Sequence, residues 1–221
     1  MSDIIITKSL SKRLGKVQAI RNVSMSVRKG EFLAIQGHSG SGKTTLLGLL
    51  AGLDSADAGE ILFNGKQITK MDEEQLALFR RENIGIVFQS FNLIPTLNAV
   101  ENIALPLFPS NMKNGEMLAK ATLAAREVGL GQRLEHYPNE LSGGEQQRIA
   151  IARALINSPK AIFADEPTGN LDSKTGKKIL ELLKQLNKEK GLTIIMVTHD
   201  DKMAKAAHRI LKIKDGVIRH G

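Results

Sequence analysis

The stretch GHSGSGKTT, residues 37–45, constrains the fold of this chain more than any other part of its sequence. It follows the apolar run FLAIQ, which is typical of a buried strand, and it leads into TTLLGLLAGL, which has the pattern of a helix. Glycines between a strand and a helix let successive backbone amides turn inward around phosphate oxygens. The sequence therefore predicts a nucleotide phosphate site within an α/β fold.

Each residue of this loop has an expected part in that site. Lys43 is placed to reach the β- and γ-phosphates, and the Thr44 hydroxyl to ligate Mg²⁺. The alternative is a glycine-rich turn with only a structural role, which the flanking strand and helix disfavour. The residues expected to contact the nucleotide are Gly37, His38, Ser39, Gly40, Ser41, Gly42, Lys43, Thr44 and Thr45.

Apolar runs that resemble strands alternate with helical patterns along the chain. The early runs alternate apolar and polar residues, which predicts antiparallel strands with one exposed face. The later runs AIFAD and TIIMVTH are continuous, which predicts parallel strands buried on both faces. We expect a mixed sheet whose ligand site lies at the carboxyl ends of the parallel strands. The predicted helices cover residues 43–51, 115–128, 144–155 and 173–188.

The length of 221 residues suits one domain that carries a smaller subdomain. No strand pattern occurs in residues 94–143, where two prolines and Gly115 mark a loop. We therefore predict a single domain over residues 1–221, with a core of about 1–93 and 156–221 and an inserted helical subdomain of about 94–155.

Composition limits the class of protein and its partners. The chain contains 31 Lys and Arg against 23 Asp and Glu, a net charge of +8, which favours a polyanionic partner. The charges are scattered, so a basic surface without such a partner is an equal alternative. No cysteine is present, which excludes disulfides and thiolate metal sites. No run reaches the roughly 18 apolar residues of a membrane span, so we expect the chain itself to lie outside the bilayer.

Four acidic or polar residues lie at the ends of three predicted strands, at the same edge of the sheet as the phosphate loop. Asp165 ends AIFAD and can hold Mg²⁺, while the adjacent Glu166 can orient or deprotonate an attacking water. Gln89 and His199 end two further strand patterns. The alternative for the two carboxylates is capping of the next helix, and for His199 it is a structural hydrogen bond.

The stretch LSGGEQQRIAIARAL, residues 141–155, reads as a helix with glycines at its start. Ser142 and Glu145 have the spacing of a capping box, so the stretch can be a well-made helix start and no more. A helix start opened by glycines also presents free amides and a partial positive charge, which suit an anion. Taken alone, the residues favour the cap.

Taken in order, these motifs resemble those of the ATP-binding subunits of ABC transporters, over nearly the whole chain. GHSGSGKT resembles the Walker A motif, Gln89 the Q-loop, LSGGEQQR the signature, AIFADE the Walker B motif, GNLD through Asp172 the D-loop, and His199 the switch histidine. Within that family, IGIVFQSFNLIPTLNAVENIALPL and DEPTGNLDSKTG look most like the macrolide-export and lipoprotein-release group.

The resemblance implies a P-loop NTPase (RecA-like) fold and ATP hydrolysis with Mg²⁺. It implies a homodimer that closes over two ATP molecules, each between one chain's phosphate loop and the other chain's signature. The catalytic residues would be Glu166, His199 and Gln89, and the magnesium ligands Thr44, Gln89 and Asp165. Asp172 would lie at the dimer contact, and the residues facing the partner chain's ATP would be Leu141, Ser142, Gly143, Gly144 and Glu145.

Leu14 departs from the family pattern. Family members usually carry an aromatic residue near this point that stacks on adenine, and the matching place in SKRLGK is Leu14. Stacking on an aromatic ring contributes roughly 1–3 kcal/mol per base in nucleic-acid complexes. Leu14 would thus contact the base through an aliphatic side chain and weaken the preference for adenine. The alternative is that Leu14 belongs to the core.

The expected partner is an integral membrane permease, and the expected location is the cytoplasmic face of the membrane. By resemblance, the apolar segment 91–97 would receive a cytoplasmic helix of the permease; by composition alone, it could be core. The second candidate function is that of a nucleic-acid-associated ABC ATPase. Such proteins carry long coiled coils between the two nucleotide motifs, and no heptad run occurs here, so no direct nucleic-acid partner is expected. A third, a small-molecule kinase, would have no use for LSGGEQQR.

Overall fold

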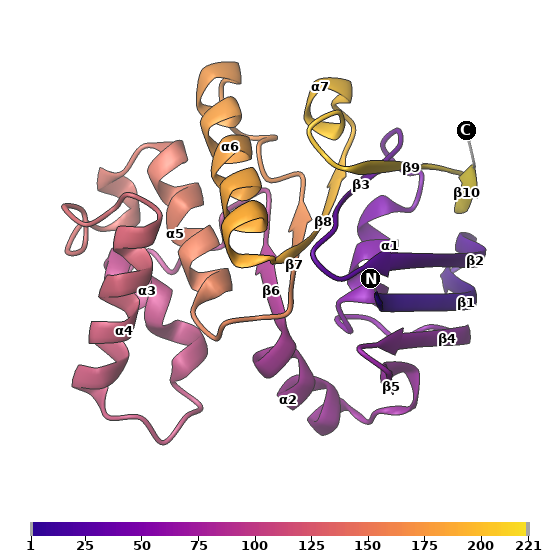
Figure 1. The fold of residues 1–221 in the computed structure, drawn as a ribbon, viewed down its shortest axis with the longest axis horizontal. Coiled ribbons are helices and arrows are strands. Elements are labelled where there is room, and N and C mark those ends of the chain that lie inside the picture. The colour runs from indigo at the N-terminus through magenta and orange to yellow at the C-terminus, as the bar shows by residue number, and fades with distance from the viewer. Residues whose placement is uncertain (1, 220–221) are drawn as a thin grey trace. The chain divides into compact units, whose positions relative to one another are not determined.

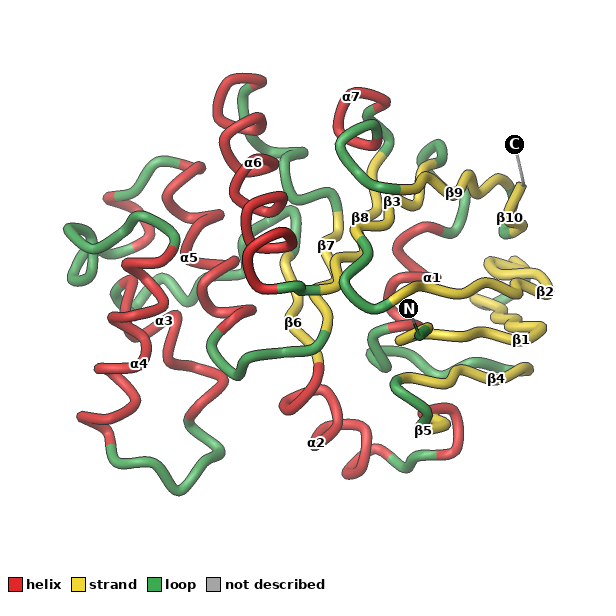
Figure 2. The backbone as a smooth tube through the Cα atoms, viewed as in Figure 1, coloured by secondary structure: helices red, strands yellow, loops and turns green. Residues whose placement is uncertain are grey.

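The structure of the chain is a computed structural model that describes residues 2–219. The chain divides into two compact units (Figures 1 and 2). The first unit runs up to Arg80 and resumes at Leu186, and the second comprises Arg81–Gln185. Helices α2 (Glu73–Asn83) and α6 (Ser173–Lys190) each have residues in both units. The predicted helical subdomain, residues 94–155, falls inside the second unit.

An antiparallel sheet in the order β2-β1-β4-β5 forms one layer of the first unit. It consists of β1 (Asp3–Leu14), β2 (Val17–Arg28), β4 (Ala58–Phe63) and β5 (Lys66–Gln67). Both β1 and β2 contain buried and exposed residues, as expected for strands with one solvent-exposed face, although several register shifts interrupt a strict alternation. The antiparallel part of the predicted fold is therefore confirmed.

Parallel strands carry the phosphate loop in the first unit. Here β3 (Phe32–Gln36) pairs in parallel with both β8 (Thr193–Thr198) and β9 (Arg209–Lys214), and β10 (Val217–Arg219) pairs antiparallel with β9. Every residue of β8 is buried, which explains its uninterrupted apolar sequence. Helix α1 (Lys43–Leu50) follows β3 directly after the loop, and a short helix α7 (Asp201–Ala204) follows β8.

The second unit pairs β6 (Ile84–Val87) in parallel with β7 (Ala161–Asp165) and contains a group of packed helices. Figure 1 shows α3 (Ala99–Ala104), α4 (Asn114–Glu127) and α5 (Gly143–Leu155) side by side, and all three pack on one another. No strand occurs in residues 94–143, as the sequence predicted. The mixed α/β fold class is thus confirmed in both units.

Two helices were missed: α2 has only four apolar residues among eleven, and α3 is only six residues long. In α2 the signal was a capping box at MDEEQ: the Asp72 carboxylate accepts from the Gln75 amide at 2.8 Å, and the Asp72 amide donates to Gln75 Oε1 at 3.1 Å. In α3 the same reciprocal bonds join Asn98 and Glu101. The elements β5, β10 and α7 were too short to show a period.

Glu31 anchors the start of β3 through a nearly buried ion pair. Its side chain is 8% exposed, and Arg209 Nε lies 2.6 Å from Glu31 Oε1. The Arg28 amide donates to Glu31 Oε2 at 2.8 Å. Burial by itself would raise the pKa of Glu31, but the hydrogen bonds from Arg209 and the Arg28 amide outweigh it and hold the pKa below its usual value.

We predict that Glu31→Gln lowers the free energy of unfolding at neutral pH by about 1–3 kcal/mol, because Arg209 loses a charged acceptor. A carboxyl group whose folded pKa is lowered stabilises the fold above its unfolded pKa and loses that effect as pH falls through the lowered value. The difference between wild type and variant should therefore shrink below about pH 4. Urea unfolding across this pH range measures it. Glu60→Gln, which breaks an exposed pair with Lys8, serves as the control and should change little.

Candidate functional site

Two glycines of the phosphate loop are required by backbone packing. A Cβ atom on Gly37 would lie 2.3 Å from the carbonyl oxygen of Ile213 in β9. Gly42 has φ 99° and is the N-cap of α1, and a Cβ there would lie 2.5 Å from the carbonyl oxygen of Ala19 in β2. Neither position has room for a side chain, so the loop backbone approaches both neighbouring strands directly.

The loop closes around its lysine and leaves one buried hydroxyl without a partner. Lys43 is 5% exposed, and its Nζ donates to the His38 carbonyl oxygen at 2.9 Å. Ser41 is 6% exposed, and its Oγ has no hydrogen-bond partner. An unsatisfied buried polar group costs about 1–3 kcal/mol. A phosphate oxygen in the loop would satisfy it, so the residues present fit the predicted nucleotide phosphates.

A cavity of about 450 Å³ lies beside the phosphate loop in the first unit. His199, the residue directly after β8, lines it together with Gly37 and His38. The side chains of Gln36 and Asp201 also line it and are hydrogen-bonded to each other. The structure thus brings His199 and the start of the phosphate loop together, as predicted for strand ends at one sheet edge.

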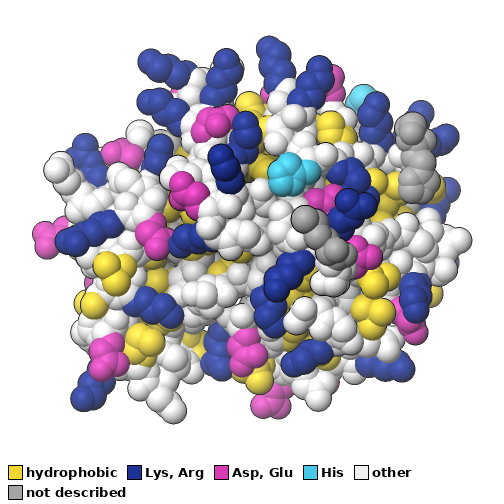
Figure 3. All heavy atoms as spheres, viewed as in Figure 1, with side chains coloured by type: hydrophobic (Ala, Val, Ile, Leu, Met, Phe, Trp, Pro, Cys, Tyr) yellow, Lys and Arg dark blue, Asp and Glu magenta, His cyan; other side chains and the backbone are white. Residues whose placement is uncertain are grey.

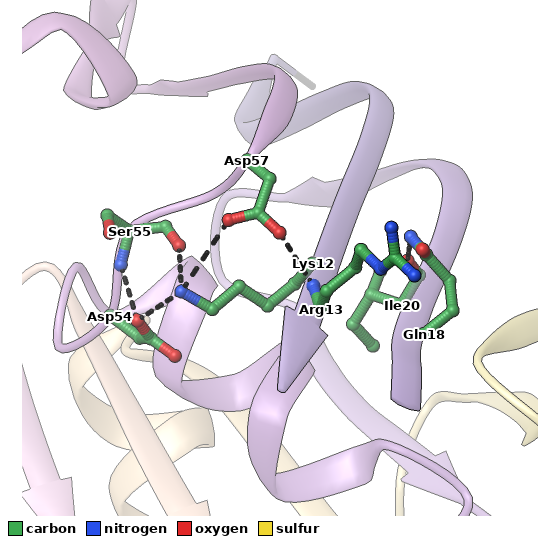
Figure 4. A network of polar contacts seen from close by, with 7 residues as sticks. All are labelled: Lys12, Arg13, Gln18, Ile20, Asp54, Ser55 and Asp57. Carbon is green, nitrogen blue, oxygen red and sulfur yellow. Dashed lines mark hydrogen bonds and ion pairs between the residues drawn. The ribbon is translucent and has the colours of Figure 1, made fainter. Parts of the chain in front are cut away.

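Leu14 lies at the tip of the β1–β2 hairpin and is 49% exposed, so the core alternative for this residue is wrong. Its cross-strand partner Val17 is 65% exposed. Figure 4 shows how the hairpin is fixed just before this tip: Lys12 Nζ lies 2.8 Å from Asp54 Oδ1, and the Arg13 amide donates to Asp57 Oδ2 at 2.7 Å. An exposed apolar pair on an anchored hairpin can cover a flat ligand ring.

In the second unit, Asp165, Glu166 and Gln89 follow the carboxyl ends of two neighbouring parallel strands. Asp165 is the last residue of β7, and Glu166 follows it in a left-handed conformation with φ 44°. Gln89 does not end its strand as predicted, because β6 stops at Val87. Since Val87 pairs with Ala164 in register, the three side chains still belong to the same end of the strand pair.

Asn170 holds Gln89 in place by two hydrogen bonds. Gln89 Nε2 donates to Asn170 Oδ1 at 3.1 Å, and Asn170 Nδ2 donates to the Gln89 carbonyl oxygen at 3.1 Å. A Cβ on Gly169 would lie 2.7 Å from Gln89 Nε2, so this glycine leaves room for the amide. Asn170 lies within the GNLD stretch, but its contact with Gln89 spans 81 positions and was not predicted.

The capping box predicted at the start of α5 is present. The Glu145 amide donates to Ser142 Oγ at 3.4 Å, and the Ser142 amide donates to Glu145 Oε2 at 2.9 Å. The Ser142 hydroxyl also donates to Glu145 Oε2 at 2.7 Å. Arg133 Nε lies 3.0 Å from Glu145 Oε1. The bonds from Ser142, followed by the bond from Arg133, hold the pKa of Glu145 below its usual value. The helix start therefore carries an ionised glutamate and two adjacent glycines.

The two glycines of this helix start are packed against residues that follow Glu166. A Cβ on Gly143 would lie 3.1 Å from Leu171 Cδ2, and a Cβ on Gly144 would lie 2.5 Å from Thr175 Cγ2. Thr175 also donates to Asp172, and its hydroxyl and amide lower the pKa of that carboxyl group. Thr175 thus lies between Asp172, to which it donates a hydrogen bond, and Gly144 of α5, against which it packs.

Arg153 is a residue of this site that the sequence did not reveal. Its guanidinium donates to the carbonyl oxygens of Phe91 and Asn92 at 2.7 and 2.6 Å. Both acceptor residues have left-handed backbones, with φ 62° and 51°. Burial lowers the pKa of Arg153, although a guanidinium remains charged. The ring of Phe91 reaches to within 3.7 Å of where a Cβ on Gly143 would lie. The turn after Gln89 is therefore hydrogen-bonded to Arg153 of α5.

The comparisons with known proteins agree with this geometry. Residues 20–169 match the profile of a family described as ABC transporter. The chain belongs to the ABC transporter family. It is an ATP-binding subunit of that family and an ATPase.

Relatives of this ABC cassette match it over nearly its whole length. An uncharacterised ABC transporter ATP-binding protein of Methanocaldococcus jannaschii is 49% identical over 96% of this chain and 95% of that protein. The macrolide export ATP-binding/permease protein MacB of Bdellovibrio bacteriovorus is 47% identical over 97% of this chain, which corresponds to 32% of MacB. A dimeric ATP-binding cassette, solved in a post-hydrolysis state bound to ADP and Pi, is 43% identical with a TM-score of 0.88, over 98% of this chain and 97% of that one.

We predict that Gly144→Ala destabilises the cassette although alanine favours helices. Alanine gains about 1 kcal/mol of helix propensity over glycine, whereas overpacking against Thr175 Cγ2 costs about 1–3 kcal/mol. Thr175→Ser removes the obstructing methyl group and keeps the hydroxyl that serves Asp172. In the Thr175→Ser background the same alanine should be neutral or stabilising. Thermal unfolding of the four chains measures the coupling, and an equal loss in both backgrounds would show that the methyl group is not the obstacle.

Proposed function

We propose that this cassette hydrolyses ATP in order to drive a separate membrane permease, in a system of the export or lipoprotein-release type. The observation that carries the proposal is the start of α5, whose first two residues, Gly143 and Gly144, place no side chain of their own over the first backbone amides of the helix. A phosphate loop alone would equally suit a small-molecule kinase. A second anion-binding helix start in the same chain has a use only where a nucleotide is held from two sides.

The residue roles follow from the chemistry of the side chains. We assign the nucleotide phosphates to residues 37–45 and the adenine contact to Leu14. Glu166 takes the proton of the attacking water, and His199 and Gln89 orient the reacting groups. The turn conformation of Glu166 and the two bonds from Asn170 to Gln89 support these assignments, because each fixes a polar side chain at a strand end.

We assign Mg²⁺ to Thr44, Gln89 and Asp165. Among residues 2–219 no group of three or more His, Asp or Glu side chains could hold a metal ion by itself. Magnesium commonly takes one or two carboxylates together with phosphate oxygens and water, so a hydroxyl, an amide and one carboxylate fit it. When bound, the ion neutralises charge on the terminal phosphates.

The two-sided site further implies a head-to-tail homodimer. In this arrangement Leu141, Ser142 and the glycines of one chain face the ATP held by the other, and Asp172 lies at the contact. The related cassette that was solved as a dimer with ADP and Pi supports this proposal. Closure would bury the charge of the phosphates against the positive end of α5, which favours the closed state while the terminal phosphate, attached or cleaved, remains in the site.

Mixing two inactive variants tests the two-chain site. Lys43→Ala removes the phosphate-binding cation, and Gly143→Asp places a negative charge at the start of α5. If each site were built within one chain, a mixture would repair nothing. Sites built across chains would leave one intact site in every mixed dimer. We expect the mixture, but neither parent, to dimerise with a non-hydrolysable ATP analogue in sizing experiments.

The control for this experiment is Gly143→Asn, which adds the same bulk without the charge. It should impair dimerisation less than Gly143→Asp, because Leu171 Cδ2 lies 3.1 Å from the added Cβ in both variants and only the repulsion differs. If the mixture dimerises no better than either parent variant, LSGGE serves only as a helix cap.

We place the permease contact at residues 91–97. Ile94 is 40% exposed, and the wholly buried Asn102 fixes the segment around it. Asn102 Oδ1 accepts from the Ile94 amide at 2.8 Å, and Asn102 Nδ2 donates to three carbonyl oxygens, those of Ile94, Leu97 and Asn98. A segment shaped in advance loses little entropy when it binds. MacB, which is named as both ATP-binding and permease protein, supports a permease as the partner.

We predict that Ile94→Glu releases the cassette from its membrane partner. The variant loses apolar burial and adds a charge, so the amount of membrane protein that co-purifies in mild detergent should fall about tenfold or more. Leu123→Glu in α4, at a position 62% exposed, is the matched control and should leave co-purification unchanged. Equal recovery with both variants would exclude the segment as the contact. Mass spectrometry of the wild-type sample would identify the permease.

The nucleic-acid alternative gains no support. Figure 3 shows Lys and Arg side chains spread over the visible face with Asp and Glu between them, rather than gathered into one patch.

None of the helices within residues 2–219 has the length and apolar character needed to cross a membrane.

A further inference from the structure

Three cations from the β9–β10 hairpin line the cavity beside the phosphate loop. Lys212 and Lys214 come from β9, and Arg219 comes from β10. Lys212 and Lys214 are two positions apart and point to the same exposed face, while the intervening Ile213 is 2% exposed and faces the core. None of the roles proposed above for ATP binding or hydrolysis uses these three side chains.

The strand register places two of the cations directly opposite each other. Arg219 pairs with Lys212 across the antiparallel β9–β10 pair. Like charges at directly opposite positions destabilise a sheet. Within residues 2–219, none of the three cations takes part in an ion pair. The hairpin therefore presents three cations to the cavity, while its turn carries one carboxylate, Asp215.

The rest of the cavity wall does little to balance that charge. Asp201 is the one carboxylate among its lining residues, and it accepts a hydrogen bond from Gln36 Nε2. The remaining polar side chains are His38 and His199, which donate hydrogen bonds when their ring nitrogens carry protons. A cavity with three cations and one carboxylate favours an anion rich in acceptor oxygens.

We propose that this cavity, which shares Gly37 and His38 with the phosphate loop, holds a second oxyanion on its hairpin side, and that this occupant is inorganic phosphate. The inference rests on the proposed function, because hydrolysis at the adjoining phosphate loop would release that anion. His199 and His38 lie on the wall shared with the loop, and Lys212, Lys214 and Arg219 contribute the hairpin side. The volume of about 450 Å³ greatly exceeds that of one phosphate, so water shares the cavity and the anion exchanges readily.

The test is phosphate binding to the nucleotide-free full-length chain, measured by calorimetry or phosphorus NMR. We expect two sites for inorganic phosphate. Lys43→Ala should weaken the site in the phosphate loop, and Lys212→Gln with Lys214→Gln should weaken the cavity site by at least about tenfold, because charge-assisted hydrogen bonds are lost. The matched control is Lys177→Gln with Lys178→Gln on α6, which removes the same charge from exposed positions and should leave both sites unchanged.

Adding ADP separates this inference from the proposed function. ADP should displace the phosphate that depends on Lys43 and leave the phosphate that depends on Lys212 and Lys214. If ADP displaces neither phosphate, the proposed nucleotide site is wrong. A phosphate that depends on Lys212 and Lys214 would still support the cavity site. If the double variant binds both phosphates like wild type, or if only the Lys43-dependent phosphate is ever found, the second oxyanion site is overturned.

Discussion

The backbone of the phosphate loop packs directly on the backbones of neighbouring strands. The part of the first unit that carries the loop depends on this packing. Gly37 lies against the Ile213 carbonyl group and Gly42 against the Ala19 carbonyl group, at distances that exclude any side chain. The Gly216 amide also donates to the Ser41 carbonyl oxygen at 3.0 Å, and the Arg21 amide donates to the Gly216 carbonyl oxygen at 2.8 Å. Segments from both sheets of the unit thus contact the loop and each other. The geometry of the loop follows from the strands rather than from its own flexible residues.

The second unit fixes its helix start by a different means. There, side chains from remote parts of the sequence fill the space that Gly143 and Gly144 leave open, with Leu171 and Phe91 on one and Thr175 on the other. Arg153 then ties the turn that carries Phe91 to the same helix. A change in the conformation of the segment after Gln89 would consequently shift the residues packed against the start of α5. The phosphate loop would not have to move for this to happen.

Much of this arrangement was predictable because local chemistry determined it. Continuous apolar runs identified β7 and β8 as buried parallel strands, and Ser142 with Glu145 identified the start of α5. The phosphate loop was recognisable because glycine, lysine and hydroxyl side chains at fixed spacing serve one ligand. The capping box at Asp72 is also a local signal, and it marks the start of α2 where apolar spacing does not.

The parts that could not be predicted depend on contacts between distant positions. Arg153 bonds to residues 61 and 62 positions away, and nothing near it in the sequence indicates those carbonyl groups. Asn170 and Asn102 are similar cases, since an asparagine in a loop or helix has many possible partners. The exposure of the apolar residue Leu14 was also not predictable from its own sequence neighbours. It depends on the position of the hairpin tip, which the contacts of Lys12 with Asp54 determine.

The capping box at Ser142 has a consequence for any anion that meets this helix. A hydroxyl group carries a single proton, and in this structure Ser142 Oγ donates it to Glu145 at 2.7 Å. The hydroxyl can donate this proton either to Glu145 or to a phosphate oxygen, whereas the two reciprocal bonds of the capping box, from the Glu145 amide to Ser142 Oγ and from the Ser142 amide to Glu145 Oε2, do not use it. The helix start therefore has two alternative hydrogen-bonded states that compete for one proton. An anion leaving the site would be replaced at once by a carboxylate already in position, which makes the departure less costly than it would be from a bare helix end.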